Sequence, residues 1–99
     1  MLHINNKQLK IIKSILKKYL PDYEILAFGS RVHGRQLKPF SDIDLVIRNQ
    51  NPLPPKLLNK IRDSFNESNL DIKVDITDWL SLTSNFQKLI LEEYEVLDF

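Results

Sequence analysis

Apolar residues recur along this chain with two different spacings, which divide it into helices and strands. Between residues 5 and 20 the apolar positions fall three or four residues apart, and this spacing predicts an amphipathic helix. Asn5 is suited to the N-cap position, Gln8 stands at the third helical position, and Pro21 ends the segment. The inward-facing positions of this helix are Leu9, Ile12, Ile15, Leu16 and Tyr19.

Two further segments have helical spacing. The segment 51–65 opens with prolines that suit a first helical turn, and it places Leu57, Leu58, Ile61 and Phe65 on one face. The segment 84–94 is predicted to begin with Ser84 as N-cap, with Gln87 three residues later. We expect this last helix to direct Phe86, Leu89 and Ile90 inward.

Strand-like segments lie between the predicted helices. Residues 24–28 form a short apolar run that ends at Gly29, and residues 42–47 and 72–77 alternate between apolar and polar side chains. The last five residues, 95–99, predict a fourth strand at a sheet edge. Because helices and strands alternate, we expect an α/β (α+β) fold with helices packed against one sheet of three to four strands.

Composition restricts the class of protein. The length of 99 residues predicts a single domain, 1–99, and 42% hydrophobic with 27% charged residues is typical of a globular chain. The chain has no cysteine, so disulfide frameworks and thiolate metal sites are excluded. No apolar run approaches the ~20 residues of a membrane span, and no signal peptide is recognisable, so we expect a cytoplasmic protein with no membrane partner.

Charge is unevenly distributed although its sum is only +1. Residues 1–20 hold five lysines and no acid, whereas residues 71–99 hold seven acids and two lysines. The small net charge gives no indication of nucleic acid as a direct partner. The two charged ends are compatible with solvated faces or with a docking surface for a charged protein.

Asp42 and Asp44 stand two residues apart in a predicted strand. Residues at this spacing point to the same face of a strand, with Cα atoms about 6.6–7 Å apart. The alternating segment 72–77 likewise places Asp75 on the face opposite its apolar residues. If the two strands are neighbours, Asp75 stands beside Asp42 and Asp44.

Three neighbouring carboxylates repel one another, since two unit charges ~5 Å apart cost about 3 kcal/mol at an effective dielectric of 20. Protonation offsets this repulsion, and so does a hard divalent cation such as Mg²⁺, which takes carboxylate oxygens together with substrate phosphates. Two such ions polarise the attacking and leaving oxygens in phosphoryl-type displacement. The alternative is that Asp42 and Asp44 only solubilise an exposed strand face.

A glycine–serine turn precedes the acid pair. Gly29 and Ser30 follow a predicted strand, and Gly34 suits the C-cap of a short helical turn. Free N–H groups at a helix start bind phosphate, Ser30 adds a hydroxyl donor, and Arg31 and Arg35 add cations. The segment is not a P-loop, because the lysine and hydroxyl residue that follow the second glycine of that motif are absent.

The stretch "GSRVHG…SDIDLVI" resembles the signature of nucleotidyltransferases of the DNA polymerase β superfamily, and most of all the minimal nucleotidyltransferases of MNT type. "IKVDITDW" resembles the strand that carries the third acid of this family, and "SLTSNFQKLILEEYEVL" resembles its C-terminal helix. The resemblance covers essentially the whole chain and implies the nucleotidyltransferase fold, with one mixed sheet.

By position, the resemblance implies that Gly29 and Ser30, with Arg31 as a weaker match, hold the triphosphate of a nucleoside triphosphate such as ATP. It implies that Asp42, Asp44 and Asp75 are catalytic and ligate two Mg²⁺ ions. Arg31 and Arg35 in these places also suit structural salt bridges. Lys38 in the following loop has two open roles, phosphate contact or solvent exposure, and Trp79 is either a packing residue or an interface anchor.

The resemblance also implies a partner. Minimal nucleotidyltransferases are typically encoded with a helical HEPN-type protein, and the pair resembles a two-part nucleotidyltransferase or a toxin–antitoxin module. For the toxin–antitoxin module, the resemblance implies that the transferase adds AMP to a tyrosine hydroxyl of the toxin. An alternative of another class is a non-catalytic partner that neutralises a toxin by covering its site. The sequence leaves the nucleotide base, the acceptor and the state of homo- or hetero-oligomerisation open.

Overall fold

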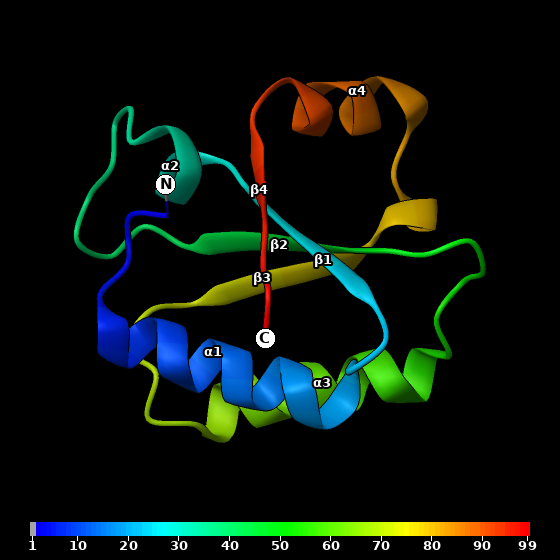
Figure 1. Ribbon diagram of the computed structural model, residues 1–99, viewed down its shortest axis with the longest axis horizontal. Coiled ribbons are helices and arrows are strands. Elements are labelled where there is room, and N and C mark those ends of the chain that lie inside the picture. The colour runs from blue at the N-terminus through cyan, green and yellow to red at the C-terminus, as the bar shows by residue number, and fades with distance from the viewer. Residues whose placement is uncertain (1) are drawn as a thin grey trace.

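Four strands form one mixed sheet with helices on both faces (Figure 1). The computed structural model describes residues 2–99. The elements in chain order are α1 (Asn6–Tyr19), β1 (Glu24–Phe28), α2 (Ser30–His33), β2 (Ile43–Arg48), α3 (Pro55–Glu67), β3 (Val74–Asp78), the 3-10 turn η1 (Trp79–Ser81), α4 (Ser84–Glu92) and β4 (Tyr94–Val96). The predicted α/β class and mixed sheet are confirmed.

The strand order is β3-β2-β1-β4. The central strand β1 runs antiparallel to both β2 and β4, whereas β2 and β3 are parallel neighbours joined through α3. The expected fourth strand lies at the sheet edge, but it covers Tyr94–Val96 and therefore begins one residue before the predicted segment. Among residues 2–99, no helix combines the length and apolar character needed to cross a bilayer.

The main core lies between the sheet and the pair α1 and α3, which together cover the lower face in Figure 1. The Asn5 carboxamide accepts a hydrogen bond from Gln8 N at 2.7 Å, and Gln8 Oε1 accepts one from Asn5 N at 3.0 Å, so the predicted capping box is present. This box fixes the start of α1. The fully buried side chains of this core are Ile12, Leu16, Leu20, Ile25, Ala27, Ile43, Leu45, Ile47 and Ile61.

A smaller apolar cluster lies on the opposite face, below α4. It consists of Leu26, Val46 and Ile90, with Phe28, Trp79 and Leu82 packed against it. Trp79 is a packing residue, because its partly buried side chain packs against this cluster and the Arg48 guanidinium lies 5.0 Å from the centroid of its ring. The strand faces therefore divide as predicted, with Ile43, Leu45 and Ile47 turned away from the acidic side chains.

Two predictions for α4 are wrong. The N-cap is Thr83, whose hydroxyl accepts a hydrogen bond from Phe86 N at 3.2 Å, while Ser84 is the first helical residue. Leu89 is 61% exposed, and only Ile90 is fully buried. The reason is geometric, because α4 meets the sheet along one narrow stripe that contains Ile90. Leu89 precedes Ile90 and lies outside that stripe, so its side chain faces solvent.

Candidate active site

The turn after β1 brings Gly29 against the acid pair. Gly29 has φ +80°, in the left-handed region that favours glycine. A Cβ at this position would overlap the carboxylate of Asp44. The backbone of the glycine–serine turn and the Asp44 side chain are therefore in direct proximity, as the sequence pattern predicted.

The short helix α2 starts at Ser30 and ends at His33, with Gly34 as its C-cap, as predicted. Gly34 has φ +74° and its N–H donates to the Ser30 carbonyl at 2.9 Å. Val32 N and His33 N donate to the Gly29 carbonyl at 2.9 and 3.1 Å. Since the first N–H groups of a helix have no partner within it, those of Ser30 and Arg31 are left to bind something else.

Arg31 does not reach this turn with its side chain. It is 6% exposed, and its guanidinium donates to the backbone carbonyls of His3, Pro39 and Ser41 at 2.8–3.1 Å. The predicted contact with a triphosphate is not supported by this placement, because the donors are already occupied. Arg31 instead ties α2 to the N-terminal segment and to the loop that leads to Asp42.

Asp44 and Asp75 are register partners in the parallel pair of β2 and β3, and Asp44 is also the register partner of Phe28 in β1. Register partners point to the same face of a sheet. Asp42 lies just before β2, two residues from Asp44. The strands of Asp44 and Asp75 are therefore neighbours, which is the condition under which the sequence predicted Asp75 beside the acid pair.

The three carboxyl groups influence one another. The pKa of Asp44 is raised from 3.8 to about 6, first by its partial burial and then by the charges of Asp75 and Asp42. Burial in low dielectric and like charges both disfavour a carboxylate. Asp44 thus has Asp75 as its register partner in β3 and Asp42 two residues earlier in the chain.

A cavity of about 200 Å³ opens at this group. Asp44 and Asp75 supply its charged lining, and Thr77 lies two residues beyond Asp75 on the same strand face. The remaining lining is apolar, from Phe28, Leu82 and Phe86. Sequence analysis did not assign these four residues to the site, although the alternation in β3 did place Thr77 on the same face as Asp75.

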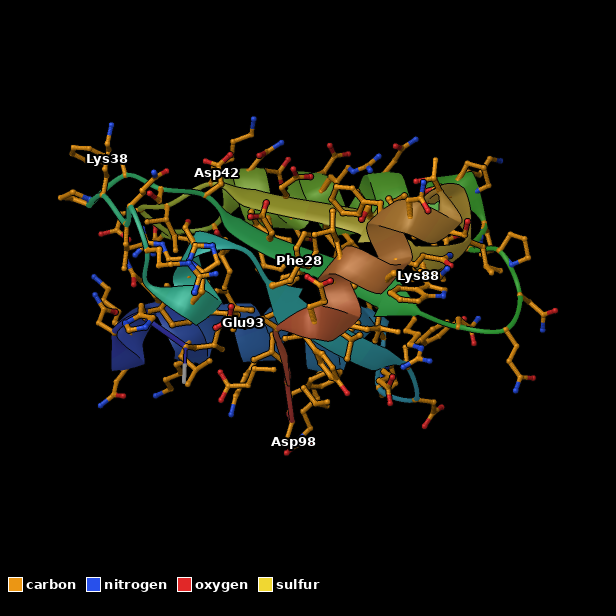
Figure 2. All side chains as sticks on the ribbon, turned by 90° about the horizontal axis from the view of Figure 1, so that it is seen from above. Phe28, Lys38, Asp42, Lys88, Glu93 and Asp98 are labelled. Atoms are coloured by element: carbon orange, nitrogen blue, oxygen red, sulfur yellow. The ribbon has the colours of Figure 1, made fainter. Side chains whose placement is uncertain are left out.

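A second cavity, of about 420 Å³, lies on the α2 side of the same region. Phe28 and Phe86 line both cavities, and their rings meet edge to face with centroids 5.9 Å apart. Arg35 and Glu93 close part of this second cavity through an exposed ion pair at 2.9 Å. In Figure 2, Glu93 lies at the end of α4 nearest α2, and Phe28 lies beneath α4.

Other cations stand further out. Lys38 lies at the outer end of the exposed loop between α2 and β2, on the far side of Asp42 from Phe28 (Figure 2).

Within residues 2–99, no three Asp, Glu, His or Cys side chains are gathered tightly enough to enclose a metal ion as they stand. The carboxylates are therefore grouped but not closed around a common point.

The chain belongs to the nucleotidyltransferase family, since the family profile described as "nucleotidyltransferase domain" matches residues 9–97. It is 38% identical to the probable protein adenylyltransferase MntA of Haemophilus influenzae over 96 residues, which cover 97% of this chain and 83% of that protein. The protein is accordingly a nucleotidyltransferase.

Solved structures agree with this fold. A mutant of the toxin–antitoxin pair MntA–HpeT superposes with a TM-score of 0.70 at 27% identity, covering 96% of this chain and 72% of the other. A toxin–antitoxin structure with AMP-PNP also has a TM-score of 0.70, at 24% identity over 89% of this chain and 70% of the other. At that identity the second likeness shows the fold alone.

Proposed function

We propose that the protein transfers a nucleoside monophosphate, most simply AMP from ATP, to a hydroxyl group of a helical HEPN-type partner protein, and so acts as an antitoxin. The observation that carries this proposal is the registered Asp44–Asp75 pair beside the Gly29 turn. The likeness to MntA, named as a probable protein adenylyltransferase, supports a protein as the acceptor.

Gly29 and Ser30 would hold the triphosphate. The left-handed turn at Gly29 exposes backbone rather than a side chain, and the first N–H groups of α2 point away from the helix. Backbone donors and the Ser30 hydroxyl suit phosphate oxygens. The likeness to MntA, a probable protein adenylyltransferase, supports an adenine nucleotide as the substrate held there.

Asp42, Asp44 and Asp75 would hold two Mg²⁺ ions. The donor set fits magnesium in its chemistry, because carboxylates together with substrate phosphates are its usual ligands. The charges of Asp75 and Asp42, which together with burial raise the pKa of Asp44, are charges that a divalent cation would balance. When bound, the ions supply charge neutralisation at the phosphates and at the attacking and leaving oxygens. Binding requires the three side chains to turn toward a common point.

In the proposed reaction, an acceptor hydroxyl oxygen attacks the α-phosphorus of the triphosphate. The new bond joins that oxygen to phosphorus, and the bond from the α-phosphorus to the β-bridging oxygen breaks, so pyrophosphate leaves. The acceptor proton passes to Asp75, from which it reaches solvent. Asp75 is suited to this step because it is exposed, whereas Asp44 is half-buried beside it.

The direct experiment incubates the protein with Mg²⁺, α-labelled ATP and the partner protein encoded next to it. We expect label on the partner, and none with Asp42→Asn/Asp44→Asn. Absence of label with all four nucleotides, while the two proteins bind, would contradict the proposal.

A second candidate function is neutralisation of a toxin by covering its site. The observation that favours it is the exposed apolar surface of α4 and β4, where Phe86, Leu89, Tyr94 and Val96 are 42–61% exposed. The double variant Asp42→Asn/Asp44→Asn separates the two candidates. Survival of neutralisation in this variant supports covering, and its loss with the complex intact supports transfer.

A further inference from the structure

An exposed ion pair links the turn after α2 to the end of α4. Arg35 Nη2 lies 2.9 Å from Glu93 Oε1, and the two side chains are 69% and 48% exposed. Glu93 is the C-cap of α4, at the end of that helix nearest α2 (Figure 2). Exposed ion pairs contribute little to stability, because solvent screens them and two long side chains must be ordered. Glu93 therefore holds the Arg35 guanidinium only weakly.

The backbone of Arg35 is more firmly placed than its side chain. Its N–H donates to His33 Nδ1 at 2.9 Å, and the next residue, Gln36, has a positive φ of +55°. The guanidinium makes no hydrogen bond within residues 2–99 other than the one to Glu93. The side chain can thus leave Glu93 without a change in the turn that carries it.

The two arginines near the glycine–serine turn differ in what their side chains can bind. Arg31 is buried, and its guanidinium donates to three backbone carbonyls. Arg35 is exposed and has a single carboxylate as its partner. Of these two arginines, only Arg35 has donors that an incoming anion reaches.

The cavity of about 420 Å³ contains this ion pair and also Gly29, where the proposed function places the triphosphate. Among the described residues that line it, Arg35 is the only Lys or Arg, whereas Glu92 and Glu93 supply two carboxylates. A helix rises about 1.5 Å per residue, so Arg35 begins about 9 Å from Gly29 along α2. A triphosphate and an extended arginine side chain together span that distance, so Arg35 meets the outer phosphates.

A triphosphate in this cavity competes with Glu93 for the Arg35 guanidinium. It carries several negative charges against the single charge of a carboxylate, and its oxygens match the forked donors of arginine. Once separated from Arg35, Glu93 also repels a triphosphate in the same cavity. Arg35 should therefore strengthen triphosphate binding, and Glu93 should weaken it.

We propose that Arg35 binds the outer phosphates of the nucleotide, and that Glu93 competes with these phosphates for the Arg35 guanidinium. The ligand class is a polyphosphate, so a nucleoside monophosphate gains nothing from Arg35. This inference rests on the proposed function, because it adds a residue to the triphosphate side of the same site.

The binding test titrates ATP, AMP and inorganic triphosphate, each with Mg²⁺, into the wild type, Arg35→Met and Glu93→Gln by calorimetry. We expect Arg35→Met to weaken ATP and triphosphate binding roughly three- to tenfold and to change AMP binding less than about twofold. Glu93→Gln should act in the opposite direction and tighten ATP binding about twofold or more. Weakening of ATP binding in both variants, or equal weakening of ATP and AMP in Arg35→Met, would overturn the proposal.

Arg48→Met and Glu24→Gln are the matched controls. Arg48 and Glu24 also form an exposed ion pair, at 3.8 Å with exposures of 43% and 50%, and they line a different cavity. These controls change the net charge as the test variants do, so screening should keep their Kd for ATP within about twofold of the wild type. A fall in ATP affinity that Arg48→Met shares with Arg35→Met would show a long-range charge effect and overturn the proposal.

The binding test does not depend on transfer. If the wild type binds neither ATP nor inorganic triphosphate, the inference fails. If ATP binds with the expected variant effects but no label reaches the partner protein, the proposed function fails and the inference stands.

Discussion

Asp44 of β2 and Asp75 of β3 stand opposite each other as register partners, with the Gly29 backbone against the Asp44 carboxylate. The proposed phosphate site at the Gly29 turn therefore lies next to the proposed site for divalent cations at Asp44 and Asp75. It also brings like charges close to the half-buried Asp44. The arrangement suits a ligand but lowers the stability of the folded protein without one.

We expect Asp44→Asn to abolish nucleotidyl transfer and to stabilise the metal-free protein. The substitution removes the central charge of the group while keeping the shape of the side chain. The gain should be about 1–2 kcal/mol at pH 7, because solvent screening reduces the repulsion below its fully buried value. Thermal unfolding without Mg²⁺ measures it, and a lower Tm for the variant would contradict the account.

The raised pKa of Asp44 also predicts a pH dependence of stability. The folded chain keeps the proton up to pH about 6, whereas the unfolded chain loses it near 3.8. The stability of the wild type relative to Asp44→Asn should therefore fall as the pH rises from about 4 to 6, and level off above that.

Urea unfolding of both proteins between pH 4 and 7.5 measures this difference. After the discount for solvent screening, the fall should be about 1–2 kcal/mol. Saturating Mg²⁺ should reduce the fall, since a cation favours the charged carboxylate. A difference that does not change with pH would show that Asp44 titrates normally.

Gly29→Ala should remove activity, while Gly34→Ala should not. Both glycines have positive φ. Alanine costs roughly 1–2 kcal/mol in the left-handed helical conformation of Gly34 and about 1–3 kcal/mol at Gly29, whose ψ of −159° lies in a region essentially restricted to glycine. At Gly29 the added methyl also overlaps the Asp44 carboxylate, whereas at Gly34 it meets the His3 ring, with Nε2 at 2.8 Å, which can move aside. Transfer rates per folded molecule should differ by more than tenfold, and equal rates would contradict a catalytic turn.

Arg31→Met should destabilise the protein by about 2–4 kcal/mol, because it removes the four hydrogen bonds that the buried guanidinium donates to the carbonyls of His3, Pro39 and Ser41. Arg35→Met is the matched control. Its ion pair with Glu93 is exposed, so we expect a loss below about 1 kcal/mol. Denaturant midpoints at pH 7 measure both, and similar losses for the two variants would refute a structural role of Arg31.

The placement of the acids shows which features of the site could be predicted from the sequence and which could not. Alternation in residues 42–47 and 72–77 fixed which face each acid takes, and the structure agrees. Alternation could not establish that β2 and β3 are parallel neighbours, because strand order depends on contacts distant in sequence. That order came only from the resemblance to a family.

The direction of the Arg31 side chain and the width of the face that α4 buries could not be predicted from the sequence. Arg31 follows the glycine–serine turn, so its position alone suggested phosphate, but nothing local shows that three backbone carbonyls surround it. Leu89 has helical spacing with Phe86, three residues earlier, yet the stripe that α4 buries is too narrow to include it. Thr83 and Ser84 are both good N-caps, and the choice between them depends on how the chain leaves η1.

The central claim is that Asp42, Asp44 and Asp75 bind divalent cations next to a triphosphate held at Gly29 and Ser30. A crystal structure with Mn²⁺ and a non-hydrolysable ATP analogue tests it most directly, because anomalous scattering locates manganese. We predict anomalous peaks ligated by all three carboxylates, with the triphosphate on the N–H groups of Ser30 and Arg31. Manganese or triphosphate bound elsewhere, with these carboxylates free, would contradict the account.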